Sequence, residues 1–142
     1  MLNPEQYENP PDDRIREIFR VYRNIAVVGL SSDESRPSFG VSRYLQRRGF
    51  KIIPVNPKET EILGEKVYPS LSDIPDKVDI VDIFRRSEFV PPIADEALKI
   101  GAKVIWLQEG VINHPAAIKA SQEGIIVVMD KCILKEHRKL CE

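Results

Sequence analysis

The sequence has little of what marks several large classes of protein. It has two cysteines, Cys132 and Cys141, among 142 residues, too few for a disulfide framework. With 21 basic and 22 acidic side chains, the net charge is −1, so no basic field calls for nucleic acid or an anionic membrane. No apolar run approaches the roughly 18 residues of a membrane span, and the N-terminus lacks the apolar stretch of a signal peptide. We therefore expect a cytoplasmic protein that binds neither nucleic acid nor membranes.

Metal-binding and disordered classes are also poorly supported. The two histidines, His114 and His137, stand far from the Cys/His spacings of metal sites. Hydrophobic residues make up 42% and charged residues 30% of the chain, an ordinary globular composition. This length predicts one domain, residues 1–142, with a core that needs no disulfides. Only nine residues are Asn or Gln while isoleucine is abundant, which favours a thermophilic origin.

The chain begins with a polar segment and a short amphipathic helix. Residues 1–13 hold three prolines and predict an arm or surface coil. Residues 14–23 predict a leading helix capped by Asp12 or Asp13, because apolar residues recur at helical spacing: Ile15, Ile18, Phe19 and Tyr22. The core is then expected over residues 24–140. We expect a monomer or a weak homodimer, since the arm and the last helix present surfaces but nothing demands a partner.

Apolar segments alternate with helical patterns along this core. The apolar segments predict strands buried on both faces: Ile25–Gly29, Lys51–Val55, Val78–Phe84, Lys103–Leu107 and Ile125–Met129. The helical patterns are Ser38–Arg48, Ile93–Ile100, a segment between Asn113 and Gly124, and Ile133–Leu140. A further short strand fits near Lys66–Tyr68, and Pro54 is expected to end the hydrogen bonding of the second strand.

This alternation predicts an α/β fold in three layers. We expect a Rossmann-like, five-stranded parallel sheet with helices on both faces. Periodicity alone does not choose between Rossmann-like and flavodoxin-like strand orders. In either order, ligands bind beyond the carboxyl ends of the strands, where the strand order reverses. The residues that follow each strand are therefore the candidate site.

The loop after the first strand suits a phosphate group. Gly29 permits a sharp turn. Hydroxyls, one arginine and a helix N-terminus follow it and supply hydrogen-bond donors and positive charge: Ser31, Ser32, Arg36 and Ser38. The loop matches neither the G-x-G-x-x-G fingerprint nor a P-loop. An ordinary serine-rich loop, with Ser38 as the helix cap, is the alternative interpretation.

The loops after the second and third strands add cations. Asn56, Pro57 and Lys58 follow the second strand, where an NAD-binding protein needs an acidic residue for its ribose. A lysine there favours a ligand with an extra phosphate, such as coenzyme A or NADP. Phe84 and Arg85, with a second arginine after them, follow the third strand, where arginine can neutralise phosphate or stack on a purine. Exposed loop residues are the alternative in both places.

Two further loops complete the candidate site. Gln108, Glu109 and Gly110 follow the fourth strand, and Gly110 permits a close backbone approach. Glu109 is more simply interpreted as a loop residue than as a catalytic acid or base, because the sequence shows no partner for that role. Cys132 follows the fifth strand beside a lysine and a helix start, surroundings that favour a reactive thiolate. An inert, buried thiol is the alternative.

The order and spacing of these motifs resemble a known family. The series runs Gly29-x-Ser31, Arg36-Pro37-Ser38, Val55-Asn56-Pro57-Lys58, Phe84-Arg85, Gln108-Glu109-Gly110-Val111 and Asp130-Lys131-Cys132. It resembles the single-domain CoA-binding proteins, relatives of the N-terminal domain of the succinyl-CoA synthetase α subunit, over roughly residues 20–140. No single motif is specific, whereas their joint order is.

The resemblance implies coenzyme A as the ligand and a sheet in the strand order 3-2-1-4-5. It also implies that the first loop holds phosphate oxygens and that Asn56–Lys58 lies by the ribose and its 3′-phosphate. By the same analogy Phe84 and Arg85 flank the adenine, and Gln108–Gly110 lies along the pantetheine. If Cys132 lines the pantetheine end, it is placed to form a mixed disulfide with the CoA thiol.

Differences between this chain and the synthetase argue against the synthetase's catalytic activity. The chain shows no second domain and no phosphohistidine region, so we expect a non-catalytic carrier or sensor of CoA or acyl-CoA. An NADP-dependent oxidoreductase, or another dinucleotide-binding protein, shares the fold but usually needs a substrate domain, for which this length leaves little room. A signalling receiver domain fits Asp82 in the third strand, but Ser31 and Ser32 stand where such a domain holds magnesium with acidic residues.

Overall fold

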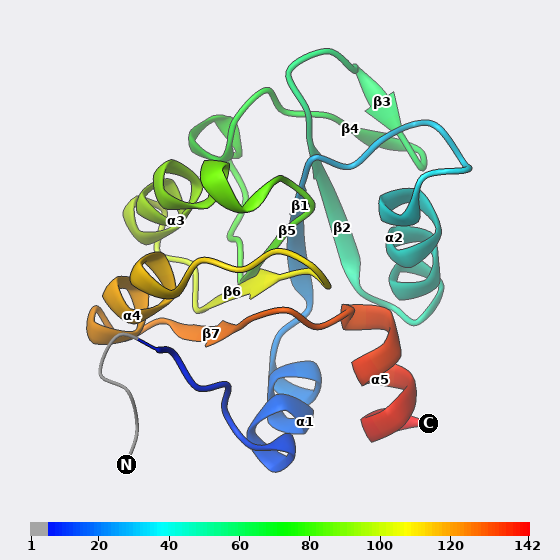
Figure 1. Cartoon of the computed structure of the whole chain (residues 1–142). Helices are drawn as coiled ribbons and strands as arrows, with labels where there is room; N and C mark the ends of the chain where they lie inside the picture. The colour runs from blue at the N-terminus through cyan, green and yellow to red at the C-terminus, as the bar shows by residue number, and fades with distance from the viewer. Residues whose placement is uncertain (1–5) are drawn as a thin grey trace.

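Five parallel strands form the central sheet of the computed structural model, which describes residues 6–142 (Figure 1). They are β1 (Asn24–Val28), β2 (Lys51–Val55), β5 (Ile80–Ile83), β6 (Val104–Leu107) and β7 (Ile126–Val128). Their order across the sheet is β2-β1-β5-β6-β7, and every neighbouring pair is parallel. The predicted α/β, Rossmann-like fold is confirmed.

The expected strand order is recovered when the short extended segment near Tyr68 is counted. A hairpin of β3 (Glu61–Ile62) and β4 (Glu65–Lys66) leads to this segment, and Tyr68 forms an isolated parallel bridge with Val55 of β2. When β1, β2, the Tyr68 segment, β5 and β6 are numbered 1 to 5 in chain order, their order across the sheet is 3-2-1-4-5, and β7 lies beyond β6. The apolar segment at 78–84 then takes fourth place and pairs with β1 rather than β2.

Helices cover both faces of the sheet (Figure 1). On one face lie α1 (Asp12–Val21), α2 (Pro37–Arg47) and α5 (Ile133–Cys141); on the other lie α3 (Val90–Lys99) and α4 (His114–Gln122). Short 3-10 turns η1 (Leu71–Asp73) and η2 (Ser87–Phe89) occupy two connections. Because side chains alternate along each strand, every strand contributes to a separate apolar cluster on each face. Within residues 6–142, no helix is long and apolar enough to cross a membrane.

Helix starts differ from the sequence predictions where prolines are involved. The N-cap of α1 is Pro11, and Asp12 and Asp13 lie in its first turn without capping it; their charge still favours the helix dipole. Both α2, from Pro37, and α3, from Val90, begin earlier than predicted because proline fits the first turn of a helix. The predicted cap of α4 is confirmed, since its Asn113 side chain accepts a hydrogen bond from Ala116 N at 3.0 Å.

The prediction that Pro54 ends hydrogen bonding in β2 is wrong. Pro54 stays in register with Val27 of β1, and its carbonyl accepts a hydrogen bond from Tyr68 N at 3.0 Å. The nitrogen of a strand residue points to the same side as its carbonyl, so the missing N–H of Pro54 faces the short edge segment. The ladder between β1 and β2 therefore continues past the proline.

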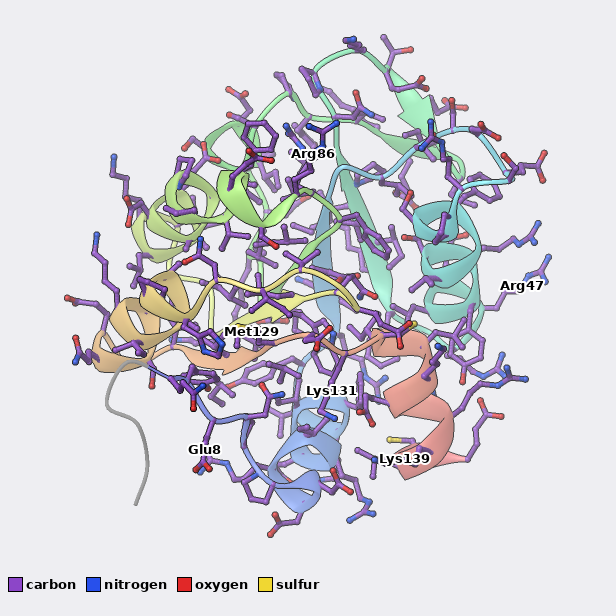
Figure 2. The ribbon with its side chains drawn as sticks, viewed as in Figure 1. Glu8, Arg47, Arg86, Met129, Lys131 and Lys139 are labelled. Atoms are coloured by element: carbon purple, nitrogen blue, oxygen red, sulfur yellow. The ribbon has the colours of Figure 1, made fainter. Side chains whose placement is uncertain are left out.

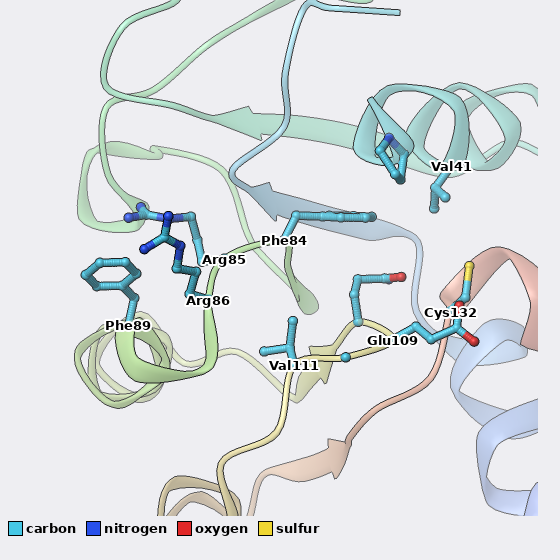
Figure 3. Close-up of a pocket in the computed structure, with 11 residues that line it drawn as sticks. Val41, Phe84, Arg85, Arg86, Phe89, Glu109, Val111 and Cys132 are labelled. Atoms are coloured by element: carbon cyan, nitrogen blue, oxygen red, sulfur yellow. The ribbon is translucent and has the colours of Figure 1, made fainter. Parts of the chain in front are cut away.

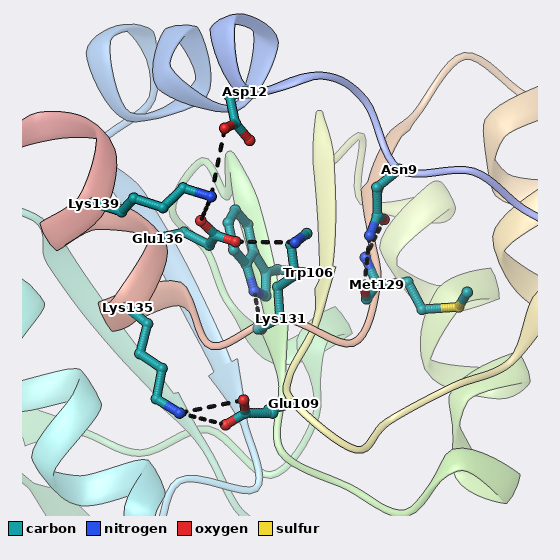
Figure 4. Close-up of polar contacts among 9 residues, drawn as sticks. All are labelled: Asn9, Asp12, Trp106, Glu109, Met129, Lys131, Lys135, Glu136 and Lys139. Atoms are coloured by element: carbon teal, nitrogen blue, oxygen red, sulfur yellow. Dashed lines mark hydrogen bonds and ion pairs between the residues drawn. The ribbon is translucent and has the colours of Figure 1, made fainter.

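The N-terminal arm lies along the edge strand β7. The Tyr7 hydroxyl donates to Val127 O at 2.6 Å. The Asn9 side chain donates to Met129 O at 2.8 Å and accepts from Met129 N at 2.7 Å (Figure 4). The arm thus satisfies backbone groups that an open sheet edge would expose, and Tyr7 binds within its own chain. Residues 1–5 of the predicted arm lie outside the described residues.

Candidate functional site

The loops at the carboxyl edge of the sheet enclose a cavity where the strand order reverses. The connection after β1 leads to α2 on one face, whereas the connection after β5 leads to α3 on the other. A cavity of about 790 Å³ opens there, a volume suited to a small-molecule ligand. Six of the predicted site residues line it: Phe84, Arg85, Gln108, Glu109, Gly110 and Cys132.

Opposite ends of the cavity differ in chemistry. Figure 3 shows Arg85 and Arg86 beside Phe89 at one end, with Glu109 and Cys132 at the other. The Arg85 guanidinium lies 4.7 Å from the centre of the Phe89 ring, a cation–π contact. Phe89 was not predicted as a site residue, although an aromatic residue shortly after a pair of strand-end arginines was its signal.

Neither arginine is neutralised by a carboxylate. Within residues 6–142, Arg85 and Arg86 form no ion pair, in contrast to Lys139 on α5, which pairs with Asp12 and Glu136. Figure 2 shows Arg86 and Lys139 on opposite sides of the view, so the cavity arginines stand apart from that ion-pair cluster. Positive charge is therefore available for a ligand at the cavity.

The opposite end of the cavity carries a paired acid and a thiol. Glu109 binds Lys135 on α5, with 3.0 Å between Nζ and Oε1 (Figure 4). This bond raises the pKa of Lys135. Gly110 N donates to the Asp130 carboxylate at 2.7 Å, which ties the loops after β6 and β7 together. Cys132 occupies the N-cap position of α5, is half-buried and lines the cavity.

Gly29 marks the closest backbone approach in the site. Its φ is +88°, and a Cβ added there would lie 2.5 Å from Phe84 O. Backbone atoms of another strand end cannot move aside as a flexible side chain does. Glycine is required at this position so that the loops after β1 and β5 can meet.

The serine-rich loop lies outside the cavity lining and is braced by its own hydrogen bonds. Ser31 N donates to Ser38 Oγ at 3.1 Å, and Asp33 N donates to Ser31 Oγ at 3.0 Å. Ser38 is buried inside the first turn of α2, whose N-cap is Arg36, so it does not cap the helix. Ser32 and Arg36 are exposed, and within residues 6–142 Arg36 forms only a long ion pair with Asp33, at 3.9 Å.

The residues after β2 also lie outside the cavity lining. The Asn56 side chain donates to Leu30 O at 3.0 Å and accepts from Lys58 N at 2.8 Å. It therefore joins this turn to the loop after β1. Pro57 and Lys58 are exposed, and Lys58 pairs with no carboxylate among residues 6–142.

A buried carboxyl group beneath the cavity was not predicted as part of the site. Asp82 in β5 is fully buried, and its Oδ1 accepts a hydrogen bond from Gln108 Nε2 at 2.6 Å. Burial raises the pKa of Asp82 to about 7, and the bond from Gln108 opposes that shift. Its sequence signal was an aspartate in the middle of an otherwise apolar strand.

Comparison with known proteins decides the family. Residues 23–138 match the family model described as CoA binding domain. The chain belongs to this CoA-binding domain family. The resemblance inferred from the loop motifs is thereby confirmed.

Relatives of two kinds share this domain. The uncharacterized protein YneT of Bacillus subtilis is 44% identical over 130 residues, covering 92% of this chain and 96% of YneT. A hypothetical protein from Pyrococcus horikoshii OT3, known as a structure, superposes with a TM-score of 0.92 at 39% identity over the full length of both chains. An acetate–CoA ligase (ADP-forming) II of Archaeoglobus fulgidus is 38% identical over 91 residues, which cover 63% of this chain but 13% of the ligase. The matched residues are thus a small part of the ligase's own length.

Proposed function

We propose that the protein binds coenzyme A or an acyl-CoA across the carboxyl ends of its strands and acts as a non-catalytic carrier or sensor. The observation that carries the proposal is the polarity of the cavity: unpaired guanidinium groups of Arg85 and Arg86 at one end, the thiol of Cys132 at the other. Coenzyme A has the matching polarity, with phosphates on its nucleotide and a thiol at the end of its pantetheine arm. Membership of the CoA-binding domain family supports the same ligand.

Each part of the ligand has a proposed set of contacts. The nucleotide binds beside Arg85 and Phe89, because guanidinium and aromatic planes both stack on a purine. The 3′-phosphate reaches Lys58 after β2, and the exposed side chains of Ser32 and Arg36 in the loop after β1 bind phosphate oxygens. The pantetheine arm runs past Gln108–Gly110 towards the opposite end of the cavity.

Calorimetric titration of ligand-stripped protein with CoA, 3′-dephospho-CoA and NADPH tests this proposal. We expect CoA to bind with a micromolar Kd, equivalent to about 8 kcal/mol. Loss of the 3′-phosphate, or Lys58→Ala, is expected to weaken binding about tenfold, because either change removes a charge-assisted contact. Lys103→Ala is the matched control, since Lys103 is also exposed but lies at the amino end of β6. Binding of NADPH without CoA would replace the proposal with the oxidoreductase alternative.

Cys132 is proposed to form a reversible mixed disulfide with the ligand. The Cys132 thiolate attacks one sulfur of CoA disulfide, a protein–CoA disulfide forms, and one CoA thiolate leaves. After incubation with CoA disulfide, we expect mass spectrometry to show one CoA adduct in the unaltered protein and in Cys141→Ser, and none in Cys132→Ser. The exposed Cys141 is the matched control because it lies at the end of α5, away from the cavity. An adduct that persists in Cys132→Ser and disappears in Cys141→Ser would refute this assignment.

A further inference from the structure

Asp82 and Gln108 form a polar pair between strands that are otherwise apolar. Asp82 stands in register with Val27 of β1 and Trp106 of β6, and both of those side chains are fully buried. Gln108 is 4% exposed and lines the cavity. An aspartate in such surroundings costs stability, and its single polar contact leads to the ligand cavity.

The hydrogen bonds of the pair leave one group free on each residue. Gln108 Nε2 donates to Asp82 Oδ1, whereas Asp82 Oδ2 has no partner within the described residues. The Gln108 amide oxygen accepts no hydrogen bond there either, and it is not among the buried side-chain atoms left without a partner. Because an amide places its donors and its acceptor on different atoms, a nitrogen directed at Asp82 leaves the oxygen for the cavity.

We propose that Asp82 is a positioning residue, which holds the Gln108 amide so that its carbonyl oxygen accepts a hydrogen bond from an N–H group of the ligand. This inference rests on the proposed function, since the pantetheine arm of CoA carries two amide groups. An ionised Asp82 accepts hydrogen bonds only and fixes this orientation. A protonated Asp82 both donates and accepts, so it also allows the reversed orientation, in which it donates to the Gln108 oxygen and the amide presents its NH₂ group to the cavity.

The charged groups near Asp82 and Gln108 do not orient the Gln108 amide in place of Asp82. At the cavity, Glu109 is already bound to Lys135 of α5, and Arg85 and Arg86 lie at the opposite end of the lining. The other titratable groups at the start of α5 are Cys132 and Glu136, and Glu136 pairs with Lys131 and Lys139. On α2, Arg43 pairs with Glu34 at 3.6 Å. The pKa of Asp82 is raised by burial and lowered only by its bond from Gln108, so both protonation states are populated near neutral pH.

A nuclear magnetic resonance titration of the ligand-free protein tests the positioning directly. We expect the Asp82 carboxyl carbon to titrate near pH 7 and the Gln108 side-chain NH₂ signals to shift with the same midpoint. Gln108 signals that stay constant through the Asp82 titration would overturn the inference. This measurement needs neither CoA nor a variant.

CoA affinity at pH 6 and pH 8 then tests the consequence for binding. We expect unaltered protein to bind more tightly at pH 8, and the ratio of the two affinities to be about fivefold larger than in Asp82→Asn, the effect of one oriented hydrogen bond. Asp79→Asn is the matched control: Asp79 is also buried, but it binds Asn24 N at the amino end of the sheet. Comparison with this control cancels the ionisation of the ligand's own phosphates.

The two proposals fail in distinguishable ways. Equal affinity ratios in Asp82→Asn and Asp79→Asn would overturn the positioning role while CoA binding stands. Absence of CoA binding at both pH values would overturn the proposed function and the ligand half of this inference, and the Gln108 titration would still decide whether Asp82 orients the amide.

Discussion

When the pH is raised from 5 to 8, the Asp82→Asn variant is expected to gain about 3 kcal/mol in free energy of unfolding relative to the unaltered protein. Burial raises the pKa of Asp82 from 3.8 to about 7, so the folded state holds this proton more tightly than the unfolded state does. Between these two pKa values, the free energy of unfolding therefore falls as pH rises. Each pH unit between the two pKa values lowers the free energy of unfolding by about 1.4 kcal/mol, and about two of these units lie between pH 5 and the pKa of the folded state. Asparagine does not ionise and escapes this loss.

Urea unfolding at the two pH values measures this difference. A new buried NH₂ group in the variant shifts its stability by a constant amount, which cancels when pH 5 is compared with pH 8. Asp79→Asn controls for loss of a buried aspartate that is held by the Asn24 amide rather than left among apolar side chains. If Asp82→Asn differs from the unaltered protein by the same amount at both pH values, Asp82 ionises as an ordinary carboxyl does.

Replacement of Gly29 by alanine is expected to cost about 3 kcal/mol or more. Its φ of +88° is strained for any residue with a Cβ, at about 1–2 kcal/mol. The added Cβ would also lie 2.5 Å from Phe84 O, so the ends of β1 and β5 must separate and lose packing. Since Phe84 lines the cavity, CoA binding should weaken in the same variant.

Gly49→Ala separates these two causes. Gly49 has nearly the same φ, +92°, but an added Cβ there meets nothing within 4 Å. Its variant should lose only the conformational term, about 1 kcal/mol, and should keep its CoA affinity. Thermal or urea unfolding of both variants gives the comparison. Equal losses would show that the contact with Phe84 is readily relieved.

The site residues that were predicted correctly are those whose position follows from the topology of the sheet. Carboxyl ends of parallel strands meet at one edge of a sheet, so residues following different strands, such as Arg85, Gln108 and Cys132, converge on one cavity whatever their side chains do. The α4 cap at Asn113 was predictable for a similar reason, because the contact is local in sequence.

The remainder depends on which groups satisfy one another in three dimensions. Ser31 and Ser38 have the composition of a phosphate loop, yet their hydroxyls accept hydrogen bonds from the loop's own backbone. The bond between Asp82 and Gln108 joins residues 26 apart on neighbouring strands, and no local pattern encodes that pairing. The positions of the site residues were therefore predicted better than their hydrogen-bond partners.

The segment at residues 7–16 is bound by residues that lie more than a hundred positions later in the sequence. Asn9 donates to Met129 O, 120 residues away in sequence, and Arg16 of α1 donates to Leu140 O of α5, 124 residues away. Figure 1 shows α1 and α5 side by side. During synthesis, the part of α1 that packs against α5 stays uncovered while more than a hundred residues emerge, a state prone to association with other chains. A nascent chain that stops short of β7 therefore leaves residues 7–16 without these binding partners.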